Sequence, residues 1–417
     1  MTHDPVLDVD VDVDAGRFGE VVVVDAAAHR SVGWSLAALA LGGFGIGTTE
    51  FATMGILPLV ASDLHSTIPE AGHLISAYAL GVVVGAPLAV VAAARMERRR
   101  LLLLLMAAFT VGNLVSAAAG SFPMLLIARF ASGLPHGAYF GIAAVVAASL
   151  VTPERRARAV ARVMLGLTVA NILGVPLSTF LGQSLGWRST YLTVNVIGVL
   201  ALVGLVSAVP RIETRPDASP RQELRALKQS QVWLTLLIGA IGFGGFFAVY
   251  SYIAPTMTTV SGLPESAVPL VLAVFGVGMT IGTLAGGRLA DWSLDRAIAI
   301  GLVLTIIVLV LFALTATVAV IAVPLVVLLG ASGSLMIPAL QTRLIDVAPE
   351  GPSLAATMNH SALNLANAIG AFLGGLVIAA GYGYTAPALV GAALATAGLG
   401  VLGVAVLTGR RHPASVR

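Results

Sequence analysis

The segment VGWSLAALALGGFGIGTTEFATMGILPLV, residues 32–60, is a long run of apolar and small residues that contains one ionisable side chain, Glu50. A helix needs about 20 such residues to cross the hydrocarbon core of a bilayer. An ionisable group within that core costs about 3 kcal/mol or more, and such groups usually handle an ion, a proton or a substrate charge. Glu50 is the chain's only carboxylate inside an apolar run of this length. The segment therefore predicts a membrane-spanning helix that carries a functional carboxyl group.

Composition places the rest of the chain in the same class. Apolar residues make up 58% of the 417 residues and charged residues 10%, and the mean hydropathy is +0.96, values outside the range of soluble globular domains. We therefore expect an all-α polytopic membrane protein with twelve transmembrane helices. The apolar runs lie near 32–60, 71–94, 101–119, 123–151, 163–182, 190–209, 231–259, 267–287, 297–316, 318–340, 353–380 and 386–408.

The cations predict the orientation of these spans, because Lys and Arg accumulate on the cytoplasmic side. With both termini in the cytoplasm, 21 of the 23 Lys and Arg residues fall on that side, Arg188 lies outside and Arg129 lies within the membrane. The sequence pI of about 9.5 therefore reports topology and not nucleic-acid binding. We expect a multi-pass protein of a bacterial-type plasma (inner) membrane that interacts with the lipid bilayer and is a monomer.

Three polar segments interrupt or flank the spans. Residues 1–31 are acidic and lack the pattern of a signal peptide, so we expect a disordered cytoplasmic tail; residues 210–230 resemble a cytoplasmic linker, and residues 409–417 a second cytoplasmic tail. The chain has no Cys, which excludes disulfides and thiol catalysis. The linker falls at the middle, between residues 32–209 and residues 231–408.

The two six-span halves are internal repeats. A shift of 197 residues superposes Gly42, Gly45, Gly47 and Pro58 on Gly239, Gly242, Gly244 and Pro255, and places Phe247 opposite Glu50. The acidic function therefore belongs to the N-terminal half alone. Two six-helix, pseudo-symmetric halves resemble the major facilitator fold, in which the substrate site lies at the midplane between the halves.

Four stretches make the resemblance more specific: GTTEFATMGILPLVASDL (47–64), ISAYALGVVVGAPL (75–88), RFASGLPHGAYFG (129–141) and ANILGVPLSTFLGQSLGWR (170–188). They are similar to the drug:proton antiporter branch of the superfamily, which includes chloramphenicol, sugar and purine exporters. The resemblance implies that Glu50 and Arg129 handle protons. It also implies an antiport-associated motif at Gly174, Pro176 and Gly182.

The loop between the second and third spans departs from the family pattern. The family usually has an Asp ahead of the Arg cluster there, whereas AAARMERRR (92–100) has Ala94 at that place, followed by Arg95. The repeat copy, GGRLAD (286–291), keeps the acid as Asp291. We therefore expect Arg95, Arg288 and Asp291 to take part in gating, with more weight on the second loop.

Several polar and aromatic side chains are candidates for substrate binding. Phe246, Phe247 and Tyr250 follow helical spacing with Phe243 and predict one aromatic face, for which ordinary helix packing or lipid contact is the alternative. His360 and Asn364 begin a polar stripe that must face a cavity or partner helices. The remaining candidates lie in the motifs quoted above. They are Tyr78, His136, Tyr139 and Asn171. For His136 among them, a hydrogen bond to a nearby backbone carbonyl is the alternative.

Helix depth supports a pairing of Glu50 with Arg129. Glu50 lies about ten residues from the outer end of its span and Arg129 about six, or roughly 15 and 9 Å. The two side chains can therefore share one layer of the membrane. A proton-dependent switch and a permanent structural ion pair are both compatible with this spacing.

Enzyme motifs do not fit this chain. It has no H-E-x-x-H, no G-x-S-x-G and no phosphate loop, so no metal site is expected and a proton gradient, rather than a cofactor or ATP, is the expected energy source. The sequence predicts proton-coupled efflux of a small, largely apolar molecule by alternating access. Proton-coupled uptake of a sugar or metabolite is the main alternative. A rhomboid-like serine protease built on Ser332 and His360 is a remote one.

Overall fold

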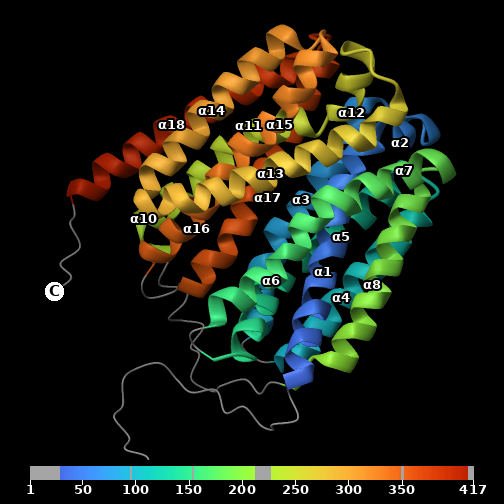
Figure 1. The fold of residues 1–417 in the computed structure, drawn as a ribbon. Coiled ribbons are helices and arrows are strands. Elements are labelled where there is room, and N and C mark those ends of the chain that lie inside the picture. Colours follow the sequence, from blue (N-terminus) through green and yellow to red (C-terminus); the bar gives the residue numbers. More distant parts are fainter. Residues whose placement is uncertain (1–28, 94–95, 153–154, 212–226, 349–351, 412–417) are drawn as a thin grey trace, which may run out of the picture.

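Twelve helices of the described chain are long and apolar enough to cross a membrane (Figure 1). The computed structural model describes residues 29–93, 96–152, 155–211, 227–348 and 352–411, and no strand occurs among them. This confirms the all-α polytopic class and the number of spans predicted from the sequence. The spans are Val32–Gly55, Ile68–Leu88, Arg98–Ala117, Phe122–Ser149, Arg158–Leu185, Arg188–Ala208, Ser230–Tyr250, Glu265–Trp292, Leu294–Thr315, Ala319–Asp346, Thr357–Ala379 and Ala386–Gly409.

The first six spans form one bundle of helices and the last six form a second. The N-terminal half contains α1 (His29–Gly55), α2 (Leu57–Asp63), α3 (Ile68–Ala93), α4 (Arg98–Ala117), α5 (Phe122–Ser149), α6 (Arg156–Val169), η3 (Ala170–Gly174), α7 (Val175–Leu185) and α8 (Arg188–Ala208). The C-terminal half contains α10 (Ser230–Leu237), η5 (Ile238–Gly242), α11 (Gly244–Tyr250), α12 (Ile253–Pro255), η6 (Thr256–Val260), η7 (Glu265–Ala267), α13 (Val268–Trp292), α14 (Leu294–Thr315), α15 (Ala319–Leu335), α16 (Ile337–Asp346), α17 (Pro352–Ala379) and α18 (Ala386–Arg411).

The first span is shorter than the predicted run 32–60, because α1 ends at Gly55 and a separate helix, α2, starts at Leu57. Pro58 occupies the first turn of α2. A proline has no N–H and disfavours helical backbone at the residue before it, so it fits the first turn of a helix and favours a break just before it. The predicted run 231–259 is also divided: α11 ends at Tyr250, and Pro255 is the last residue of α12, directly before the π-helical turn η6.

The internal repeat is visible in how closely the helices approach. A Cβ atom placed on Gly81 would lie 2.1 Å from the carbonyl oxygen of Phe130, and one placed on Gly278 would lie 2.2 Å from that of Val327. The shift of 197 residues converts the first pair into the second. The α3–α5 and α13–α15 helix pairs are therefore built alike, and glycine is required where a side chain would strike the backbone of the partner helix.

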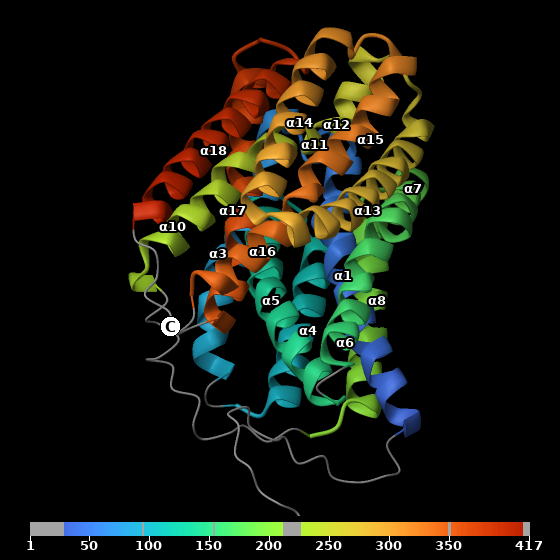
Figure 2. The same ribbon diagram turned by 60° about the vertical axis from the view of Figure 1, so that its left-hand side comes forward.

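The halves meet along two helix pairs, α3 with α17 and α13 with α7 and η3; Figures 1 and 2 both show α13 beside α7. The Ser76 hydroxyl donates to the carbonyl of Ala368 at 3.2 Å, and Gln183 donates to the carbonyl of Glu265 at 2.9 Å. The core of the C-terminal half continues across this interface to residues of α1 and α2. The candidate site lies on these facing helices.

Four predicted features lie wholly or partly outside the described residues. They are the tail at 1–31, most of the linker at 210–230, the tail at 409–417 and the loop residues Ala94 and Arg95. The predicted disorder of the tails, the character of the linker and the gating role of Arg95 stay predictions.

Candidate transport site

Glu50 lies near the end of α1 and is 6% exposed. Its carboxylate accepts no hydrogen bond and forms no ion pair within the described ranges. Arg129 and Tyr78 of the N-terminal half and Tyr250 of the C-terminal half lie within electrostatic range of it. The carboxyl group is therefore buried, lies near residues of both halves and has no hydrogen-bond or ion-pair partner within the described ranges.

Arg129 of α5 is fully buried, but it does not form the expected ion pair with Glu50 in this conformation. Its guanidinium donates to the hydroxyl of Thr49 at 3.0 Å and to the backbone carbonyl of Thr49 at 3.2 Å. It also lies over the ring of Tyr78, 4.3 Å from the centroid, and 5.5 Å from that of Tyr191. The cation is therefore held beside the acid, through the residue that precedes the acid.

A chain of polar side chains extends from this arginine in both directions. The Thr49 hydroxyl donates to the amide oxygen of Asn113 at 2.7 Å, and on the other side the Tyr78 hydroxyl and Nδ1 of His136 are 3.1 Å apart. Thr49, Asn113 and Tyr191 were not among the predicted residues. Asn113 could have been found, because it is an amide in the otherwise apolar run 101–119.

Two of the predicted histidines meet across the halves. The rings of His136 on α5 and His360 on α17 have centroids 6.4 Å apart, and Phe140 stacks on His360 with centroids 5.6 Å apart. A Cβ atom on Gly141 would lie 3.3 Å from the Thr357 hydroxyl, so α5 and α17 are close at this point. The polar chain of the N-terminal half therefore reaches the other half at His360.

The aromatic face predicted near residues 243–250 forms a cluster within the C-terminal half. Phe246, Phe247 and Tyr250 are each 3% exposed or less, and Tyr250 stacks on Phe275 of α13 at 3.8 Å. Phe51 of α1 lies parallel to Phe247 across the interface, with centroids 6.2 Å apart. The cluster thus packs against the residue next to Glu50, and its role in substrate binding stays a prediction.

The other predicted residues lie at helix contacts. The Tyr139 hydroxyl donates to the carbonyl of Leu39, which ties α5 to α1. The amide nitrogens of Asn171 and Asn364 donate to carbonyls one turn earlier, whereas their oxygens are buried without a partner within the described ranges. Pro176 follows the π-helical turn that ends at Gly174. A Cβ atom on Gly174 would lie 2.2 Å from the Thr48 hydroxyl.

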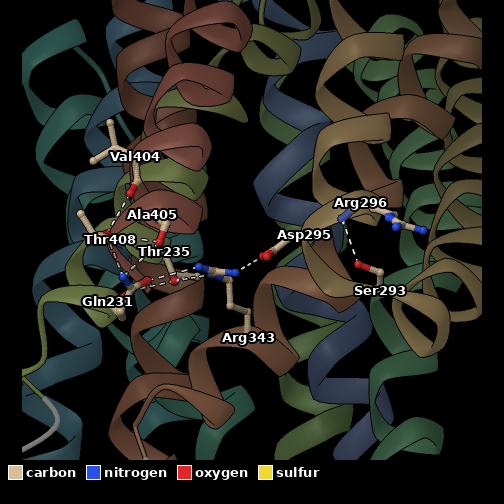
Figure 3. A network of polar contacts seen from close by, with 9 residues as sticks. All are labelled: Gln231, Thr235, Ser293, Asp295, Arg296, Arg343, Val404, Ala405 and Thr408. Atoms are coloured by element: carbon tan, nitrogen blue, oxygen red, sulfur yellow. Dashed lines mark hydrogen bonds and ion pairs between the residues drawn. The ribbon is translucent and has the colours of Figure 1, made fainter. Parts of the chain in front are cut away.

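Polar contacts near the predicted second gating loop centre on a different acid. Arg288 and Asp291 are exposed, and their gating role stays a prediction. Asp295 instead forms an ion pair with Arg343, which is 9% exposed on α16 (Figure 3). From the sequence, Arg343 is only one of the 21 cations expected on the cytoplasmic side.

The same arginine links two further helices, α10 directly and α18 through Gln231. It donates to the hydroxyl of Thr235 at 3.1 Å and to the side chain of Gln231 at 3.2 Å, and Gln231 donates in turn to Thr408 of α18 (Figure 3). Arg343 thus connects α10, α14, α16 and α18. This network holds together one end of the C-terminal half.

The remote protease alternative finds no support in side-chain geometry. The Ser332 hydroxyl donates to the carbonyl of Leu329, and Thr305 donates to Ser332, both at 3.2 Å. No hydrogen bond joins Ser332 to His360 in the part of the chain that the structure describes.

Comparison with known proteins decides the family. A family model described as Major Facilitator Superfamily matches residues 39–358 and 249–417. The chain belongs to the major facilitator superfamily. This membership confirms the predicted family, and it makes the protein a multi-pass membrane transporter of a class that is not normally enzymatic.

Relatives and solved structures agree with the family. The chain is 40% identical to the inner membrane transport protein YdhP of Escherichia coli strain K12, over 92% of this chain and 98% of that protein. It is 35% identical to a chloramphenicol resistance protein of Streptomyces lividans, over 82% of this chain and 87% of that protein. A bacterial homolog of the human lysosomal transporter Spinster, inward-facing and occupied, has a TM-score of 0.73 at 16% identity, covering 91% of this chain and 97% of that chain. A D-xylose-proton symporter has a TM-score of 0.72 at 16% identity, covering 89% of this chain and 97% of that chain. These similarities indicate an inner-membrane transporter, and the two structures share its fold.

Proposed function

We propose that this transporter exports a small, largely apolar molecule from the cytoplasm in exchange for protons. The observation that carries the proposal is Glu50, a buried carboxyl group between the halves with no ion-pair or hydrogen-bond partner in the described ranges. A structural acid in a membrane protein is paired, because an unpaired charge in the bilayer is costly. An acid that alternates between charged and neutral forms instead needs a site that both forms can occupy.

Alternating access would use this acid in the following order. With the site open to the cytoplasm, deprotonated Glu50 admits the substrate between the halves. When the site opens outward, a proton takes the place of the substrate on Glu50, and this proton leaves to the cytoplasm when the site opens inward again. Arg129, fixed on Thr49, keeps a positive charge beside the carboxylate during this exchange. One proton crossing the membrane releases about 2.3 kcal/mol per 100 mV, which supports roughly a fifty-fold outward gradient of a neutral substrate.

Two observations favour an apolar substrate. The C-terminal side of the site is an aromatic cluster, in which Phe247 faces Phe51 and Tyr250 faces Phe275. Aromatic rings bind apolar and cationic molecules through surface burial and ring contacts rather than through directed hydrogen bonds. One relative is named as a chloramphenicol resistance protein, which makes chloramphenicol the first compound to test.

Uptake by proton symport is the second candidate, and its support is limited to the shared fold of a D-xylose-proton symporter. Inverted membrane vesicles separate the two directions. An exporting antiporter releases protons from acidified vesicles when substrate is added to the medium. An uptake symporter in the same vesicles instead carries its substrate out of the vesicle lumen together with protons.

The test compares Glu50→Gln with the wild type in inverted vesicles that contain a pH-sensitive dye and receive chloramphenicol or a panel of sugars and nucleobases. We expect Glu50→Gln to insert normally and to lose substrate-dependent proton release. Glu265→Gln is the matched control, because Glu265 is exposed and its substitution makes the same chemical change. Full, uncoupler-sensitive transport by Glu50→Gln would refute the assignment of the coupling acid.

A further inference from the structure

The N-terminal half has a groove on its outer surface, away from the site between the halves. It has a volume of about 880 Å³ and lies between α3, α4 and α5. Its walls are large apolar residues such as Leu88 and Ile127, which are 61% and 70% exposed. Its floor is formed by small residues, namely Gly85, Ala108, Gly112, Ala128 and Ala131.

The small residues of the groove have larger counterparts in the other half. The shift of 197 residues replaces Ala108 and Gly112 by Thr305 and Leu309, which are fully buried in the other half. It likewise replaces Ala128 and Ala131 by two leucines. Larger side chains thus stand at the corresponding positions of α14 and α15, whereas small residues of α4 and α5 line the groove.

The length of the groove suits an acyl chain. Along α4 its lining runs from Leu101 to Val115, about 21 Å at 1.5 Å per residue. The hydrocarbon of one leaflet is about 15 Å deep, half of the bilayer core, so the groove is longer than one leaflet is deep. The lining is nearly all apolar, so hydrocarbon fills it at no cost in unpaired polar groups.

A cation precedes the groove-lining residues of α4 at one end of the groove. Arg98 precedes Leu101 by one helical turn and shares a face of α4 with Leu101, Leu105 and Ala108, which follow the same spacing. Its side chain forms no hydrogen bond or ion pair within the described ranges, whereas the neighbouring Arg99 donates to the carbonyl of Val206. A guanidinium at the membrane surface binds phosphate groups through paired hydrogen bonds.

We propose that this groove is a binding site for one anionic phospholipid, with an acyl chain along the surface of α4 and α5 and the phosphate on Arg98. Part of the floor, Ala128 and Ala131, belongs to α5, the helix that carries Arg129 and His136 on another face. A bound lipid therefore supports the helix that positions the coupling site. The proposal requires only that the chain spans a membrane and is independent of the direction of transport.

Native mass spectrometry of the full chain in mild detergent tests the site, using phosphatidylglycerol and phosphatidylcholine with identical acyl chains. We expect the wild type to retain one phosphatidylglycerol in preference to phosphatidylcholine. Ala108→Phe/Ala131→Phe should fill the groove and abolish this retention, and both positions are exposed, so the larger side chains have room. Ala393→Phe, at an exposed alanine of α18, is the matched control and should bind lipid as the wild type does.

Arg98→Gln provides a second variant that leaves the groove open. It should keep the bound acyl chain but lose about tenfold in preference for phosphatidylglycerol, the effect of one charge-assisted contact. Equal retention of both lipids by the wild type, or unchanged retention by the filled variant, would overturn the proposal. Displacement of the lipid by chloramphenicol would do the same, because it would assign the groove to an apolar substrate.

Discussion

Arg129→Lys separates a positioning role of this arginine from a purely structural one. The guanidinium makes two hydrogen bonds to Thr49 and lies 4.3 Å from the centroid of the Tyr78 ring. A hydrogen bond from a charged donor contributes about 1.5–3 kcal/mol, and a cation over a ring in a dry environment about 2 kcal/mol. Lysine keeps the charge, but its ammonium cannot bond both Thr49 atoms and lie flat on the ring. We therefore expect a loss of about 2–3 kcal/mol, which a folded protein can tolerate.

Transport should fall even among the molecules that remain folded. Thr49 precedes Glu50 on α1, so its two hydrogen bonds to Arg129 fix the depth and rotation of the acid. We expect Arg129→Lys to lower substrate-dependent proton release by about tenfold or more per folded molecule, since a misplaced group of this kind costs at least 1.4 kcal/mol. The assay is vesicle transport, normalised to protein that melts cooperatively by tryptophan fluorescence.

Arg188→Lys is the matched control. Arg188 also bonds two acceptors, Asp63 at 2.7 Å and the carbonyl of Ala119 at 3.0 Å, and lies 4.3 Å from the Trp187 ring centroid. Its side chain is 42% exposed and bonds neither Thr49 nor Glu50, so we expect little change in stability and none in transport. Wild-type transport per folded molecule by Arg129→Lys would show that Arg129 is structural and would refute the positioning role.

Three further predictions follow from other parts of the structure. Asp63 lies in α2 outside the spans, and hydrogen bonds from Trp187 and Arg188 lower the pKa of its carboxyl group. The stability advantage of the wild type over Asp63→Asn should therefore be complete above about pH 5 and should disappear as the pH falls below about 3.9 and through the lowered pKa. An advantage that persists at lower pH would contradict this. Gly133→Ala should destabilise by about 3 kcal/mol in thermal melting, because its Cβ would lie 2.1 Å from the carbonyl oxygen of Tyr78, whereas Gly141→Ala, at 3.3 Å from a side-chain hydroxyl, should change stability little. The chain has no native Cys, so Ser184→Cys should react with an impermeant maleimide in intact cells and Thr152→Cys only after permeabilisation; the reverse pattern would invert the predicted orientation.

The sequence was sufficient to predict the spans and the buried acid, because both depend on composition. Twelve apolar runs require twelve helices in a bilayer, and Glu50 stands out as a carboxyl group within one of them. The break after Gly55 was missed, although Pro58 is a local signal for it. Helix boundaries depend on such local details more than helix existence does.

The partners of the charged residues could not be read from spacing along the chain. The depth of each residue along its helix predicts that Arg129 lies in the layer of Glu50. Adjacent residues of a helix point about 100° apart, however, and the rotation of the helix decides that Thr49 faces the arginine. The same limit applies to Arg343, which bonds Asp295 while Asp291 lies exposed on the preceding helix. Contacts between helices distant in sequence require the packed structure.

The internal repeat explains why one half carries the charge chemistry and the other the apolar surface. In the register of 197 residues, the polar chain of the N-terminal half falls on apolar positions of the C-terminal half. Thr49, Glu50, Tyr78, Arg129 and His136 correspond to Phe246, Phe247, Phe275, Val326 and Gly333.

These counterparts are themselves in contact. The rings of Phe246 and Phe247 are 5.0 Å apart, those of Phe246 and Phe275 are 5.1 Å apart, and a Cβ atom on Gly333 would lie 2.4 Å from Phe246. One scaffold therefore holds a hydrogen-bonded cation beside the acid in one half and a packed aromatic cluster at the equivalent place in the other. The proposed exchange of a proton for an apolar molecule would use these two different environments, which meet where Phe51 stacks on Phe247 next to Glu50.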